Sequence, residues 1–204
     1  MRSLLPIMAG AAAFACAGTP AVPVSMPTAG EAGGEVMFLP LGTVGTGATF
    51  DVQRVVGPTV NMALTPEGVW GGDLRGRNLV LEVSEGRLRG AGFDVAVQRE
   101  GEALRLAGLV GNRRVNVHIS PKRFQGAFDI SGCSFDLPRE TPGSYQGFLS
   151  CPAPRSPSVS TVLSSGERLP TVTSTSLRLT GDAARLDSPV MPQLALALLA
   201  VLPL

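Results

Sequence analysis

The chain has 204 residues, of which 44% are hydrophobic and only 16% are charged, and it contains 25 glycines and 17 prolines. This composition is typical of a turn-rich β protein, and the length is sufficient for one domain with a buried core. The net charge is +1, which gives no electrostatic reason to expect nucleic acid as a partner.

Residues 1–17 resemble an export signal. Arg2 supplies a positive charge, and the apolar run that follows is too short to cross a bilayer as a helix. Two interpretations of its end are open. In the first, the small residues before Cys16 form a bacterial lipobox and Cys16 becomes lipidated, although Ala13 stands where a lipobox usually has Leu, Val or Ile. In the second, Ala15-Cys16-Ala17 is an A-x-A cleavage site, and the protein is secreted without the cysteine.

Residues 18–47 consist mainly of Ala, Gly, Pro, Thr and Val with few charges. Such a stretch buries too little apolar surface to offset the entropy lost on ordering it, so we interpret it as a flexible tether. Pairing of residues 35–40 as an edge strand is an equally open alternative. The folded domain is expected to span residues 48–151, beginning with a strand that contains Phe50 and Val52.

A repeated pattern dominates this expected domain. Three segments, which begin at Val60, Leu79 and Val115, read apolar-x-apolar-x-apolar, then Ser or Thr, then a short turn, then apolar-x-Gly. A looser copy begins at Val95. Alternation with a period of two is typical of half-buried antiparallel strands. The pattern therefore predicts an all-β fold, an antiparallel meander of short hairpins that closes into a small barrel or folds into a two-layer sandwich.

The glycines of the repeats are expected on the inward face, because each follows an apolar residue by two positions. They are Gly71, Gly90, Gly108 and Gly126. Inward glycines are found where a strand bends or where a sheet coils tightly. The same alternation places Trp70 on the outward face beside Gly71, where it is a candidate contact for a sugar or a partner protein.

Cys133 and Cys151 flank the last clear hairpin of the pattern. Folding this hairpin about residue 142 sets the two cysteines opposite each other, and an even number of cysteines suits an oxidising compartment. The pair has no partner histidine and no CxxC spacing, so we predict a structural disulfide rather than a metal site.

The chain after Cys151 changes composition twice. Residues 152–170 are rich in Pro and Ser and are typical of a linker, whereas residues 171–180 alternate enough to form a closing strand. The final segment, residues 189–204, is strongly apolar and too short for an ordinary transmembrane helix. It is expected either to dock on the domain as a helix or strand, or to be a GPI-attachment signal that is removed.

No pattern in the sequence indicates a catalytic, cofactor or metal site. The single histidine, His118, falls on the outward face of a strand without a neighbour at metal-ligand spacing. There is no Gly-x-Ser-x-Gly elbow and no phosphate-binding glycine loop. Arg87 and Arg89 share the outward face of one strand, where they are either candidate contacts for an anionic glycan or lipid headgroup or part of a mixed solvated surface.

The sequence therefore predicts an exported, non-enzymatic protein of the cell envelope, anchored through a lipid on Cys16 or secreted, with a structural or binding role. The expected partners are a membrane, another envelope protein or a hydrophobic small molecule. Two alternatives are a β-barrel that carries a small hydrophobic ligand in its lumen and a secreted hydrolase with an unrecognised site.

Overall fold

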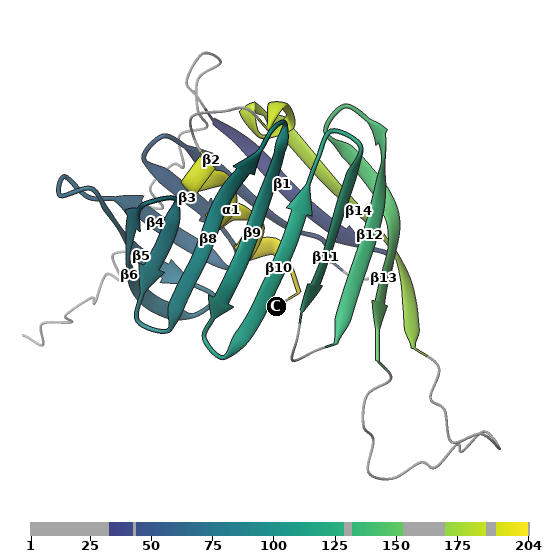
Figure 1. Ribbon diagram of the computed structural model, residues 1–204, viewed down its shortest axis with the longest axis horizontal. Helices are drawn as coiled ribbons and strands as arrows, with labels where there is room; N and C mark the ends of the chain where they lie inside the picture. Colours follow the sequence, from purple (N-terminus) through teal and green to yellow (C-terminus); the bar gives the residue numbers. More distant parts are fainter. Residues whose placement is uncertain (1–32, 43, 129–131, 153–169, 187–190, 204) are drawn as a thin grey trace, which may run out of the picture.

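The computed structural model describes residues 33–42, 44–128, 132–152, 170–186 and 191–203, and its strands form one closed antiparallel barrel (Figure 1). The strands are β1 (Gly33–Pro40), β2 (Thr46–Asp51), β3 (Arg54–Gly57), β4 (Val60–Leu64), β5 (Val69–Leu74), β6 (Arg77–Ser84), β7 (Arg87–Gly90), β8 (Phe93–Glu100), β9 (Ala103–Val110), β10 (Arg113–Ile119), β11 (Arg123–Phe128), β12 (Cys133–Thr141), β13 (Ser144–Cys151) and β14 (Thr171–Gly181). Each strand pairs with the next along the chain, and β14 returns to β1. The predicted meander is confirmed, and it closes as a barrel rather than a sandwich.

Alternation along the strands separates an apolar lumen from a polar outer face. In β10, Val115, Val117 and Ile119 are buried, whereas Asn116 between them is exposed. Residues opposite one another on paired strands lie on the same face, so the buried Leu106 of β9 adds to the same inward layer as Val117. The interior is therefore a continuous hydrophobic core that lines the barrel.

The barrel extends beyond residues 48–151 at both ends. Residues 33–40, expected within the tether, form β1, which pairs with β14 on one side and β2 on the other. Val36 and Phe38 of β1 are buried in the lumen. Hydrogen bonding on both edges and this burial offset the cost of ordering a segment whose composition suggested a tether. The expected closing strand over residues 171–180 is β14. Residues 18–32 and most of the expected linker lie outside the described residues.

The second strand of the first repeat, β5, faces the opposite way from the expectation, whereas Val60 and Met62 of its first strand are buried as the pattern indicated. Trp70 is 1% exposed and lies opposite Leu81 on the inward face, so its placement on the outer surface is wrong. Gly71 pairs with Ala63 and Val80 on the outward face, and its predicted inward position is also wrong. The cause is the turn. Five residues separate the paired Leu64 and Trp70, whereas four separate the paired Val83 and Leu88 of the next hairpin. One added residue exchanges the faces of a strand.

Gly72 takes the inward position in place of Gly71, and the inward placement of the other three glycines is confirmed by their partners. The four inward glycines are then spaced by 18 residues throughout: Gly72, Gly90, Gly108 and Gly126. At each of them a Cβ atom would overlap a backbone carbonyl oxygen of the preceding strand or press closely against it, namely that of Asn61, Val80, Asp94 and Asn116, respectively. The glycines therefore mark where neighbouring backbones approach most closely as the sheet coils.

The apolar C-terminal segment forms a helix, α1 (Met191–Val201), that lies inside the barrel between its front and back strands (Figure 1). A short 3₁₀ helix, η1 (Asp182–Arg185), precedes it after β14. Residues 193–202 are all buried, and α1 contacts β1, β2, β3 and β8. A helix that is apolar on all sides is stable in water only when it is enclosed, and here the barrel encloses it. The lumen is thus filled by the protein's own chain.

Polar contacts hold both ends of α1. At its start, the Nε2 of Gln193 donates to the carbonyl oxygen of Val52 in the β2–β3 turn at 2.8 Å. At its end, the Arg75 guanidinium donates to the carbonyl oxygen of Leu202 at 2.6 Å, and the Thr59 hydroxyl donates to that of Ala200 at 2.9 Å. A cation at a helix C-terminus compensates for unpaired carbonyls. Burial, with a smaller contribution from Arg113, lowers the pKa of Arg75.

Cys133 and Cys151 form the predicted disulfide, which joins the first residue of β12 to the last residue of β13. Replacing both cysteines with serine should lower the free energy of unfolding by about 3 kcal/mol, because the bridge restricts the unfolded chain over a loop of this length. Urea denaturation of the double variant and the native protein measures the difference. A non-reduced tryptic digest that lacks the linked peptide would contradict the bridge itself.

Candidate binding surface

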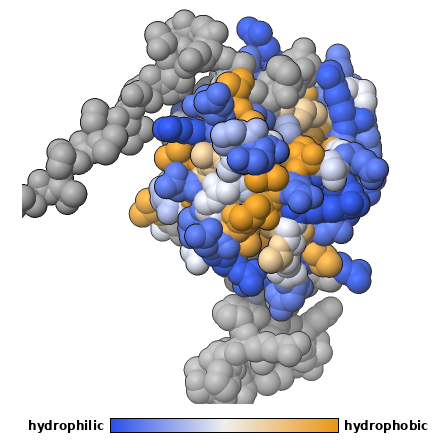
Figure 2. Space-filling view, turned by 90° about the vertical axis from the view of Figure 1, so that its left-hand side faces the viewer, coloured by the Kyte–Doolittle hydropathy of each residue, from blue (hydrophilic) through white to orange (hydrophobic). Residues whose placement is uncertain are grey.

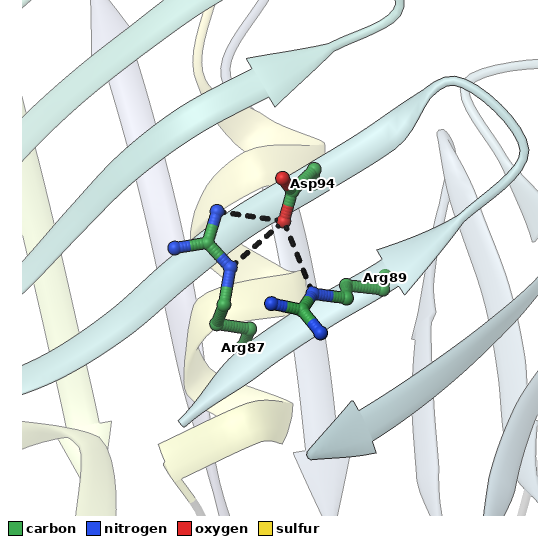
Figure 3. A network of polar contacts seen from close by, with 3 residues as sticks. All are labelled: Arg87, Arg89 and Asp94. Carbon is green, nitrogen blue, oxygen red and sulfur yellow. Dashed lines mark hydrogen bonds and ion pairs between the residues drawn. The ribbon is translucent and has the colours of Figure 1, made fainter. Parts of the chain in front are cut away.

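The structure does not bring the three predicted contact residues together. Trp70 packs inside the lumen, whereas Arg87 and Arg89 lie on the outer face of β7. Both arginines converge on the carboxylate of Asp94 in β8 (Figure 3). One carboxylate oxygen accepts from the Nε and an Nη of Arg87 at 2.9 and 2.7 Å, and the Nε of Arg89 lies 3.6 Å from it. This ion-pair network cancels one of the two positive charges and leaves a weaker anion contact than the sequence suggested.

Three exposed hydrophobic side chains on β4 and β6 form no recognisable site. Val80 lies on the outer face of β6, whereas Leu64 and Val83 lie opposite the buried Trp70 and Leu88 and are exposed at the ends of the inward faces of their strands. Figure 2 views the molecule from the side of these strands and shows hydrophobic surface interspersed with hydrophilic side chains. Exposed aliphatic residues among charged neighbours are usual on protein surfaces. We therefore assign no ligand to this face.

His118 lies outward on β10, as predicted, and its ring is only partly exposed. Its Nδ1 atom is buried and has no hydrogen-bond partner within the part of the chain that the structure describes. Its cross-strand neighbours are Arg105 of β9 and Gln125 of β11. Because Nδ1 is buried, a ligand over this face would meet the exposed part of the imidazole ring and the neighbouring guanidinium and amide groups rather than Nδ1 itself.

A shallow groove of about 320 Å³ runs over β9, β10 and β11 beside this histidine. The residues that line it are Glu100, Arg105, Asn116, His118, Gln125, Gly126 and Ala127. Two of them, Gly126 and Ala127, contribute little side-chain volume, and the others carry hydrogen-bonding groups. The groove therefore combines a low floor with polar walls.

The strand register explains this shape. One row of long outward side chains crosses the sheet through Gln98, Arg105, His118, Gln125 and Asp136. The adjacent row, two residues away along each strand, is made of small side chains apart from one asparagine: Ala96, Ala107, Asn116, Ala127 and Ser134. Neighbouring strands are about 4.8 Å apart, so each row presents a side chain at that interval. A row of small residues beside a row of large ones leaves a trough.

The charges of the groove nearly cancel. The guanidinium of Arg105 lies 3.3 Å from the carboxylate of Glu100, and both side chains are about half exposed. The remaining polar groups are the amides of Asn116 and Gln125 and the imidazole of His118, each of which can donate and accept hydrogen bonds. Such a lining suits a neutral, hydroxyl-rich ligand better than an ion.

An exposed aromatic ring extends the same row. Phe148 of β13 is 62% exposed and lies opposite Asp136, two strands beyond Gln125. Asp136 itself is paired with the Nε of Arg123 at 3.0 Å. An aromatic face next to hydrogen-bonding side chains is a common arrangement for stacking a sugar ring.

Sequence reasoning missed Arg105, Asn116 and Gln125 as members of one site. They belong to three different strands, and only the register of β9, β10 and β11 brings them together. The available signal was the outward row of β10, where Asn116 and His118 are both polar and planar. That signal does not reveal which residues of other strands lie beside it.

Within the described residues there is no group of three or more His, Cys, Asp or Glu side chains that could hold a metal ion. Of the helices in the same part of the chain, none combines the length and apolar character needed to cross a membrane. Comparison with known proteins gives no relative: no protein-family model, no curated protein and no solved structure matches the chain.

Proposed function

We propose that the protein is an exported, non-enzymatic binding protein of the cell envelope whose outer groove holds a neutral oligosaccharide. The observation that carries this proposal is the polar, nearly neutral lining of the groove, in which His118 lies beside Arg105, Asn116 and Gln125. Amide and imidazole groups form directional hydrogen bonds with sugar hydroxyls, and Phe148 offers a face on which a ring can stack.

The filled lumen supports binding on the outside. Side chains of α1 such as Leu196 and Leu198 are 0% exposed within the barrel. A ligand in the lumen would have to replace these contacts, each of which contributes hydrophobic stabilisation. The outer groove, in contrast, is open to solvent without rearrangement.

Attachment to the envelope is the second part of the proposal. The N-terminal pattern around Cys16 resembles a lipobox, and the Cys133–Cys151 disulfide suits an oxidising compartment. The barrel would then be held at the membrane by the chain that precedes β1, with the groove available to glycans of the envelope.

Glycan binding should depend on the groove residues. Gln125→Ala and His118→Ala are each expected to weaken binding of the best oligosaccharide by about tenfold, because each removes a hydrogen-bonding partner of the ligand. A glycan array identifies the ligand, and isothermal titration calorimetry measures the affinities. Asn61→Ala, an exposed outward substitution on β4, is the matched control and should bind normally. If all three variants bound the oligosaccharide as tightly as the native protein, the groove would not be its binding site.

Lipidation should depend on Cys16. In the native host, the mature protein is expected to carry an acylated Cys16 and to fractionate with membranes, whereas Cys16→Ser should remain unacylated. Intact-mass spectrometry of the purified protein measures the modification directly. A native protein that begins after Ala17 would show simple secretion and remove the anchor from the proposal.

A carrier of a small hydrophobic ligand is the second candidate, and the apolar lining of the lumen favours it. In this candidate α1 occupies the place of the ligand and must move to admit it. A thermal-shift screen against lipids and hydrophobic dyes separates the candidates. A carrier would be stabilised by such a ligand, whereas the glycan-binding protein would not.

A further inference from the structure

A second cavity, of about 330 Å³, lies at the rim of the barrel where the β8–β9 and β10–β11 turns approach η1. Its lining includes three arginines, Arg99, Arg139 and Arg185, which we call the rim arginines. They come from β8, β12 and η1, which are far apart in the sequence. The barrel closure brings them together.

Two of the rim arginines occupy positions that alternation would assign to the core. Arg99 pairs with the buried Leu104, and Arg139 pairs with the buried Tyr145, so both continue the inward face of their strands. Every earlier inward residue of β12 is apolar. The last inward layer at this rim is therefore cationic, and although both side chains are exposed, their like charges repel each other unless an anion compensates for them.

Within the described part of the chain, no carboxylate neutralises the rim arginines. The Nε of Arg99 donates to the carbonyl oxygen of Gly101 at 3.0 Å, and an Nη of Arg139 donates to that of Pro121 at 2.9 Å. Among the described residues, none of the three guanidinium groups lies within ion-pair distance of a carboxylate. Glu102 is the one acidic residue among the described residues of the lining, which gives these residues a net charge of +2.

The hydrogen bonds to backbone carbonyl oxygens also hold the guanidinium groups of Arg99 and Arg139 in place at the cavity. Each contact uses one donor of a guanidinium and leaves its other donors for a ligand. The hydroxyl of Tyr145 donates to the carbonyl oxygen of Ser120 at 3.0 Å, which fixes the β10–β11 turn, and burial raises the pKa of this phenol. Part of the ordering cost of an anion site is therefore already met in the free protein.

We propose that the rim arginines bind a phosphate group. Planar guanidinium forks match the oxygens of a phosphate, and the cavity is large enough for a phosphate ester. The same chemistry is offered by an anionic phospholipid headgroup and by free phosphate, so the source is decided by experiment.

The cavity lies at the rim from which β1 starts, so a lipid headgroup is the first source to test. The carboxylate of Asp182 in η1 accepts a hydrogen bond from the backbone N–H of Gly33 at 2.9 Å, so the cavity and the start of β1 share one rim. If Cys16 is acylated, the chain between Cys16 and Gly33 can hold this rim no farther than about 60 Å from the bilayer. This limit on the distance to the bilayer depends on the proposed lipid anchor at Cys16, whereas phosphate binding by the rim arginines does not.

The test uses the full-length chain carrying Cys16→Ser, so that no lipid anchor contributes to binding. Isothermal titration with inorganic phosphate and flotation with phosphatidylglycerol or phosphatidylcholine vesicles are compared at physiological salt. The double variant Arg99→Gln/Arg185→Gln should weaken phosphate binding by about tenfold or more. The control Arg77→Gln/Arg113→Gln removes the same charge from the opposite rim, and its phosphate affinity should be unchanged.

A lipid headgroup is the source if the protein binds phosphate and floats with phosphatidylglycerol vesicles but not with phosphatidylcholine vesicles. Arg99→Gln/Arg185→Gln should then lose both phosphate binding and flotation. Phosphate binding without flotation supports the site with free phosphate as its source. Absence of phosphate binding, or an equal loss in both double variants, would overturn the proposal. Oligosaccharide binding should be the same in all of these proteins, so failure at the rim leaves the outer groove untouched.

Discussion

Replacing Leu196 with aspartate should abolish the stable barrel or expel α1 from its lumen. Leu196 is 0% exposed at the centre of a helix that the barrel encloses. A carboxylate at this position would lose its hydration without gaining a partner. The free-energy cost of burying it exceeds the free energy of unfolding that is usual for a domain of this size. Thermal denaturation measures the loss of stability, and binding of a hydrophobic dye reports an emptied lumen.

Two further variants make this result specific to the lumen. Leu196→Met conserves volume and should change the free energy of unfolding by less than about 1.5 kcal/mol. Val80→Asp places the same carboxylate on the outer face, where the valine is 61% exposed, and should have little effect. A Leu196→Asp protein that melts like the native protein, without added dye binding, would show that α1 does not fill the barrel in solution.

Alanine substitutions at the adjacent Gly71 and Gly72 should have opposite outcomes. A Cβ at Gly72 would overlap the Asn61 carbonyl oxygen, and the φ of 142° at this residue is unfavourable for a side chain. We expect Gly72→Ala to lower the free energy of unfolding by at least about 1–3 kcal/mol. At Gly71 the nearest atom to a new Cβ is a methyl carbon of Thr65 at 3.8 Å, so Gly71→Ala should be neutral or slightly stabilising.

The pair of variants tests the register of the first hairpin directly. Urea denaturation under identical conditions gives both free energies, and the two proteins differ only in which of two neighbouring residues carries the methyl group. If Gly71→Ala were the damaging change, the inward face of β5 would be the one that the repeat pattern indicated. If both substitutions had equally small effects, the backbone of β5 would not approach that of β4 closely at either glycine.

Both experiments probe the scaffold on which the candidate sites depend. The groove beside His118 requires the register of β9, β10 and β11, and the rim arginines require the barrel closure that brings β8, β12 and η1 together. Loss of the scaffold would therefore remove both sites together. The substitutions proposed at Gln125 and Arg99 lie on exposed side chains and should leave the scaffold intact.

The local pattern of the sequence was sufficient for the type of fold. Alternation of apolar residues predicted the strands, and the turn chemistry and spacing predicted a meander that had to close on itself. The position of Cys133 and Cys151 predicted their bridge. These features follow from interactions between residues close in the sequence, where the period of two and the length of a hairpin determine the geometry.

Only the tertiary structure decided which faces meet and what fills the centre. One added residue in the first turn reversed the faces of Trp70 and Gly71, a difference too small for the repeat pattern to reveal. The assignment of residues 33–40 depended on β14 being free to pair with them, and the place of α1 depended on the width of the closed barrel. The groove and the rim arginines likewise join residues from several strands. Such contacts are set by register and closure, which depend on the packing of the whole chain rather than on any single stretch of it.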